Sequence, residues 1–137
     1  MAALVAVLMF AAVSQAQTGT EQLVSSWAKV NVCTPSQVGA RAQLAGDGSK
    51  KHMYVRFTAQ WLSDDGWVPI GGSATSPWLS AGTADLTWQQ AGWTFNMNAL
   101  TAGQTYQIRA VAELQWRNGG SVARSSTFTT GTCTVTG

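Results

Sequence analysis

Alternation of apolar and polar side chains is the feature that most constrains the fold of this chain. In the longest run, every second position from Tyr106 to Trp116 is apolar, and the positions between are mainly Gln, Arg and Glu. Successive side chains of a β-strand point to opposite faces, so this pattern predicts a strand with one buried and one solvated face. Shorter runs of the same kind predict further strands at 30–33, 53–61, 93–98 and 121–130.

Turn motifs separate these runs. Asn118-Gly119-Gly120 has the residues that supply the positive φ of a tight hairpin, and Asp64-Asp65-Gly66 marks another turn. Residues 71–92 are less regular, and we expect a long loop that crosses between sheets, with one short strand near Asp85–Trp88. No segment after residue 16 has helical periodicity. The sequence therefore predicts an all-β, antiparallel sandwich or barrel in one domain, residues 17–137.

The first 16 residues have the features of an export signal. Residues 2–13 are an unbroken apolar run, and Ser14 and Ala16 match the small-x-small pattern before a cleavage site at Gln17. The run is shorter than the roughly 20 residues that span a bilayer. We therefore expect a helical signal peptide at residues 1–16 that is cleaved, and a secreted product that is not membrane-bound; a buried N-terminal helix is the alternative.

Cys33 and Cys133 are the only cysteines. Export places them in an oxidising compartment, so we expect one disulfide that links the first strand to the end of the last. Free or intermolecular thiols are the alternative. His52 is the only imidazole, which leaves too few ligands for a zinc site.

Residues 100–112 carry a family resemblance. Leu100, Gly103 and Tyr106 stand where fibronectin type III and related immunoglobulin-like domains have the Leu, the turn Gly and the Tyr of a tyrosine corner. The resemblance implies an immunoglobulin-like antiparallel β-sandwich of about seven strands, in which Tyr106 is structural. The chain departs from that family at 37–45, where no Trp occurs, and in its cysteines, which lie near the two ends.

Composition argues against several functions. Charged residues make up 10% of the chain and the net charge is +2, too little for a nucleic-acid interface. No Gly-x-Ser-x-Gly elbow occurs, and the Asp64-Asp65 turn has too few oxygens for Ca²⁺. We expect no enzyme, no cofactor and no metal. A hydrolase that pairs Asp64 or Asp65 with Asp47 or Asp85 is a minor alternative.

Tryptophan is the most informative residue type, because seven occur. Trp61, Trp93 and Trp116 have the apolar parity of their strands, and we expect them in or beside the core. Trp67, Trp78 and Trp88 lie in turn-like surroundings, and we expect them to be exposed. Exposed Trp can stack on sugars or anchor a protein interface, although it can also cover the ends of a sandwich.

Our main interpretation is a secreted, non-catalytic binding module that takes a polysaccharide or cell-envelope polymer through Trp67, Trp78 and Trp88. The alternative is a structural, adhesion or assembly subunit of an extracellular layer, which binds protein partners through strand edges or a Trp patch. The sequence does not specify an oligomeric state.

Overall fold

The structure is a computed structural model that describes residues 25–98 and 100–137. The predicted signal peptide at 1–16 lies outside the described residues. The described residues form nine strands: β1 Trp27–Cys33, β2 Gln37–Ala45, β3 His52–Ser63, β4 Gly66–Pro69, β5 Leu79–Thr83, β6 Trp88–Asn96, β7 Thr105–Asn118, β8 Ser121–Thr129 and β9 Cys133–Thr136. No helix in this part of the chain is long and apolar enough to cross a membrane.

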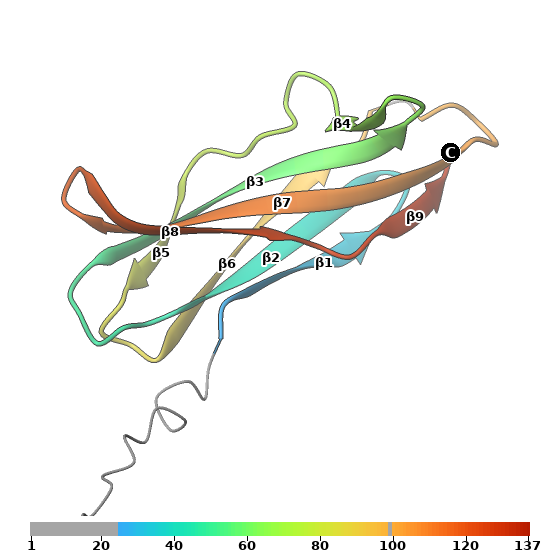
Figure 1. Ribbon diagram of the computed structural model, residues 1–137. Helices are drawn as coiled ribbons and strands as arrows, with labels where there is room; N and C mark the ends of the chain where they lie inside the picture. The colour runs from blue at the N-terminus through green and yellow to red at the C-terminus, as the bar shows by residue number, and fades with distance from the viewer. Residues whose placement is uncertain (1–24, 99) are drawn as a thin grey trace, which may run out of the picture.

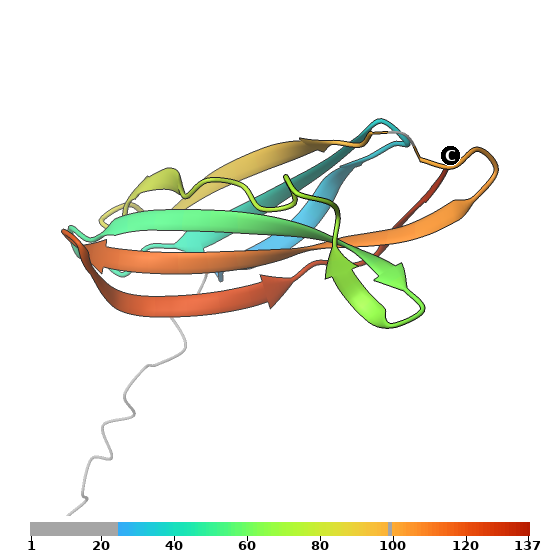
Figure 2. The same cartoon turned by 90° about the horizontal axis from the view of Figure 1, so that it is seen from above.

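The strands form two antiparallel sheets that pack as layers (Figures 1 and 2). Sheet A has the order β1-β2-β6. Sheet B has the order β4-β3-β7-β8, with β5 also paired to β3 and β9 also paired to β7. The predicted all-β antiparallel sandwich is thus confirmed, with nine strands in the described residues in place of the expected seven or so.

The core lies between large side chains of sheet B and small ones of sheet A. Strands β3 and β7 bury Phe57 and Trp116, whereas β2 buries Ala40 and Ala42. The small residues let the two sheets approach closely around the large ones. Trp116 is fully buried, as its strand parity predicts, and its Nε1 donates a hydrogen bond to the carbonyl of Ala45 in sheet A at 3.1 Å.

A smaller apolar cluster closes one end of the sandwich around the disulfide. Cys33, the last residue of β1, is bonded to Cys133, the first residue of β9, and their Cα atoms are 6.1 Å apart. The predicted disulfide is confirmed. Because β1 belongs to sheet A and β9 to sheet B, the bond joins the two sheets covalently.

The connection from β6 to β7 returns to the sandwich at Tyr106. The Tyr106 hydroxyl accepts a hydrogen bond from the backbone N–H of Thr101 at 3.1 Å. This donor stabilises the phenolate and lowers the pKa of Tyr106. Leu100 packs against the smaller cluster, and Gly103 has a φ of 78°, a left-handed conformation that favours glycine. A tyrosine corner requires such a hydrogen bond between the tyrosine hydroxyl and the upstream backbone.

Two predictions about residues 71–97 are wrong. The expected loop at 71–92 contains β5 and the first half of β6, and the short strand expected near Asp85–Trp88 is instead mostly the turn between β5 and β6. Trp93 has the inward parity of its strand but is 38% exposed, because β6 is an edge strand and its side chain leaves the sandwich there. At an edge strand, the alternation of apolar and polar residues is a weaker guide to burial, and the prediction for Trp93 depended on it.

Candidate functional site

The outer face of sheet B carries arginines stacked on aromatic rings. Alternate residues of β3 and β7 point into the core, so the residues between them point outward and form cross-strand pairs. We call this surface the arginine–aromatic face; it consists of Tyr54, Arg56, Trp67, Trp78, Arg109 and Arg117. All six side chains are partly buried.

One end of this face is built on the β3–β4 hairpin. The guanidinium of Arg109 lies 4.2 Å from the ring centroid of Trp67. Its Nε donates a hydrogen bond to Oε1 of Gln60 at 2.9 Å. The ring and the amide together fix the plane of this guanidinium on the sheet.

At the other end, two arginines share one tryptophan. Arg117 lies 4.2 Å from the ring of Tyr54 and 4.7 Å from that of Trp78, while Arg56 lies 4.5 Å from Trp78. The Nε of Arg117 donates to Oε1 of Gln115 at 2.8 Å. Arg56 differs, because its Nε bonds Oε2 of Glu113 at 2.8 Å, which raises the pKa of Arg56.

The structure brings two of the three predicted ligand-binding tryptophans to one face. Trp67 and Trp78 are half-buried on sheet B, each with one side of its ring covered by arginine. Trp88 is 47% exposed and pairs with Ala45 on the outward side of sheet A, so it lies on the opposite face of the sandwich. The sequence places Arg109 and Arg117 on an outer sheet face, but it does not predict their stacking on Trp67 and Trp78, because β4 and the segment before β5 are expected as turn and loop.

Sheet A exposes its edge strand β6. Gly46 N bonds Thr87 O at 2.9 Å, and Met97 N bonds Ser36 O at 2.8 Å, one bond at each end of the β2–β6 ladder. In an antiparallel ladder these bonds recur at every second residue, so the odd-numbered residues of β6 bond β2. The even-numbered residues therefore point their backbone N–H and C=O groups to the outer edge, where no strand among residues 25–98 and 100–137 pairs with β6.

The other edges carry features that discourage strand pairing, whereas β6 carries none. Strand β1 has Lys29 and a register shift, and β8 has Arg124 and a register shift. Strand β4 ends at Pro69, and β5 is only five residues long. Strand β6 has nine residues without a charge or a proline, and its ladder to β2 is unbroken. Such an edge is a ready template for pairing with another chain.

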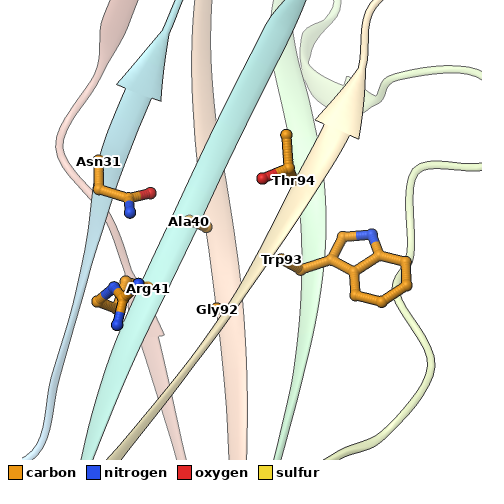
Figure 3. A pocket seen from close by; sticks show the side chains of 6 residues that line it. All are labelled: Asn31, Ala40, Arg41, Gly92, Trp93 and Thr94. Atoms are coloured by element: carbon orange, nitrogen blue, oxygen red, sulfur yellow. The ribbon is translucent and has the colours of Figure 1, made fainter.

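A shallow hollow lies on sheet A beside this edge. It is lined by Asn31, Ala40, Arg41, Gly92, Trp93 and Thr94 (Figure 3). Figure 3 shows the ring of Trp93 projecting from β6 on the side away from β2. Gly92 has no side chain to fill the hollow, and a Cβ there would meet the Ala40 carbonyl oxygen at 3.0 Å.

The structure does not bring Asp64 or Asp65 near Asp47 or Asp85, as the predicted carboxylate pair would require. Asp47 and Asp85 lie at the end of the sandwich where β3 begins, since Asp47 N bonds the carbonyl of Ala84. Asp64 and Asp65 lie in the turn after β3, about 35 Å away along that strand. Within the described ranges, no three His, Cys, Asp or Glu side chains gather as a metal site would need.

No family model matches the chain, and no curated protein matches its sequence. Among solved structures, it is similar to self-complemented MyfA, the major subunit of Myf fimbriae from Yersinia enterocolitica, in one structure alone and in another in complex with galactose. The identities are 18% and 19%, the matches cover 83% and 82% of this chain and 100% of MyfA, and the TM-scores are 0.48 and 0.46.

Spo0M, a sporulation control protein from Bacillus subtilis, is similar at 14% identity over 84% of this chain and 51% of that one, with a TM-score of 0.41. At these identities and TM-scores, the similarities do not identify a family, a ligand or a partner for this chain.

Proposed function

We propose that this protein is a secreted, non-catalytic adhesion or assembly subunit that joins other protein chains through the edge of strand β6. The main support for this proposal is that β6 differs from the other edge strands. It alone combines nine residues with no charge, no proline and no register shift. An added strand would bond the outward backbone groups of Trp88, Gln90, Gly92, Thr94 and Asn96.

Exposed aromatic side chains support the same role. Trp88 and Trp93 are 47% and 38% exposed at this strand, and Trp is among the residues that dominate the binding energy of protein interfaces. The disulfide between Cys33 and Cys133 suits the oxidising compartment that the predicted signal peptide implies. We further propose that the domain is related to fibronectin type III domains, which the Tyr106 corner supports.

Sedimentation velocity of residues 17–137 at rising concentration tests this function. We expect the wild-type sedimentation coefficient to increase with concentration. Thr94→Lys, which adds a charge on the outer side of β6 without removing a bond to β2, should hold the protein monomeric. Ser125→Lys on β8 is the matched control and should behave as wild type. A wild-type protein that stays monomeric at every concentration would contradict the proposal.

Binding of a neutral polysaccharide is a second candidate, favoured by the outer face of sheet A. Trp27 and Trp88 flank a pair of amides there, in which Gln90 Nε2 donates to Gln43 Oε1 at 3.0 Å. Such a surface offers aromatic faces for sugar C–H groups and amides for sugar hydroxyls. Tryptophan fluorescence titration with soluble polysaccharides tests it, and we expect a saturable shift that Trp88→Ala removes and Trp67→Ala leaves in place.

A further inference from the structure

We infer that the arginine–aromatic face of sheet B binds an acidic polysaccharide, with the guanidinium groups of Arg109 and Arg117 holding its carboxylate or sulfate groups. This surface lies on the opposite side of the sandwich from the outer face of sheet A. The inference therefore does not depend on association through β6.

The first argument is positive charge that no acidic side chain among residues 25–98 and 100–137 neutralises. Glu113 is the one acid among the outward-facing residues of β3 and β7, and Arg56 binds it at 2.8 Å. Arg109 and Arg117 instead donate from Nε to the neutral amides of Gln60 and Gln115. Two positive charges are therefore left on this face for a ligand.

The second argument is that both guanidinium groups are held in place. Each one lies over at least one aromatic ring, Trp67 for Arg109 and Tyr54 with Trp78 for Arg117, at centroid distances of 4.2 to 4.7 Å. Each Nε donates its hydrogen bond to a glutamine. The terminal Nη groups can therefore form a bidentate hydrogen bond with a planar or tetrahedral anion. A preorganised donor loses less entropy when the anion binds.

The spacing of the charges indicates the type of polymer. Arg109 and Arg117 are eight residues apart on the same face of β7, which places their Cα atoms roughly 27 Å apart. Nucleic acid carries about one charge per 1.7 Å of duplex and is bound by dense cation clusters. Two cations this far apart, with Val111, Glu113 in its ion pair with Arg56, and Gln115 between them, match a polysaccharide with widely spaced acidic groups better.

Isothermal titration calorimetry of residues 17–137 at low salt tests the inference with four probes. Polygalacturonate supplies carboxylates, dextran sulfate supplies sulfates, neutral dextran is the uncharged control, and single-stranded DNA supplies dense phosphates. We expect one or both acidic polysaccharides to bind, and their binding to weaken as salt is raised. Any binding of neutral dextran on sheet A should not change with salt or when Arg109 and Arg117 are replaced. The acidic polysaccharide that binds more tightly identifies the preferred anion.

Variants locate the site. Arg109→Gln with Arg117→Gln should raise Kd about tenfold or more, and Lys at both positions should raise it less, since Lys keeps the charge but not the planar fork. Arg41→Gln, an exposed arginine on sheet A, is the matched control and should bind as wild type. Sedimentation of the double Gln variant should match wild type, which separates this site from the β6 edge.

Several results would overturn the inference: no binding of either acidic polysaccharide, binding of neutral dextran that falls equally when Arg109 and Arg117 are replaced, an equal loss in Arg41→Gln, or tighter binding of DNA. Near-UV circular dichroism of each variant checks that it is folded. A double Gln variant that is folded yet binds as wild type would show that these arginines only stabilise the sheet.

Discussion

Sheet A and sheet B differ in what they bury and in what they leave open. Sheet B supplies most of the large core residues, including Met53, Phe57 and Trp116, whereas the central strand of sheet A supplies mainly alanine, valine and leucine. On the outside the difference is again clear, because aromatic rings on sheet B are covered by arginines while Trp88 on sheet A is 47% exposed.

This difference indicates which part of the molecule determines its stability and which part we expect to mediate association. The long β3–β7 pair holds the core and has neighbouring strands on both sides. Strand β6 has a neighbour on one side only among the described residues, so changing its outer edge should leave the core unaltered. Stability should therefore respond to sheet B and to the links between sheets, and association to β6.

The largest expected effect is the loss of a core side chain of sheet B. Trp116→Ala removes a fully buried ring and its hydrogen bond to the Ala45 carbonyl. We expect the free energy of unfolding to fall by about 3–5 kcal/mol, measured by guanidinium denaturation. Trp88→Ala on sheet A should change it by no more than about 0.5 kcal/mol. Equal losses in the two variants would contradict the difference between the sheets.

The second-largest loss of stability is expected when the disulfide between the sheets is removed. The disulfide joins residues separated by 100 positions, which the chain-entropy model values at about 4.7 kcal/mol. Cys33→Ala with Cys133→Ala should lower the free energy of unfolding by about 2–5 kcal/mol. Wild type under a reducing agent is the control and should unfold at a similar midpoint. A stable reduced protein would mean that packing alone holds the sheets together.

The fold was predictable from sequence where strands face both core and solvent. β3 and β7 alternate strictly because one side of each strand is buried, and this pattern predicts their existence and inward faces. Strand β6 keeps that pattern only in its second half, and the short β4 and β5 lack it, since edge strands contact solvent on more than one side. Trp93 shows the consequence, because inward parity does not bury a side chain at an edge.

The surface was less predictable than the fold. Which outward residues meet depends on strand pairing. Arg56 comes from β3, Arg117 from β7, and Trp78 from the segment before β5. The spacing of these residues along the sequence does not show that they meet on one face. The exposure of single residues such as Trp88 could be anticipated, but their separation onto two faces required the sheet order.

A smaller effect is expected at Tyr106, where the chain returns from sheet A to sheet B. Tyr106→Phe removes the acceptor of the Thr101 N–H but keeps the ring, which packs edge-on against Trp61 at 6.0 Å. We expect a loss of about 0.5–1.5 kcal/mol in the free energy of unfolding. Tyr54→Phe on the outer face is the control, and a loss there as large as at Tyr106 would argue against a structural corner.

The smallest expected effect is at Asp47, in the connection from sheet A to sheet B at the opposite end. Hydrogen bonds from Ser49, with Lys51 Nζ 3.2 Å from Oδ2, lower the pKa of Asp47 from 3.8 to about 2. A lowered folded-state pKa stabilises the protein above the unfolded-state pKa, and this contribution is lost as pH falls from about 4 towards 2. Asp47→Asn should abolish that part of the acid dependence, a difference below about 1 kcal/mol because the pair is near the surface. Thermal unfolding of both proteins between pH 5 and pH 2 measures this difference in acid dependence. If the stability of both proteins falls equally with pH, the Asp47 carboxylate does not stabilise the connection between the sheets.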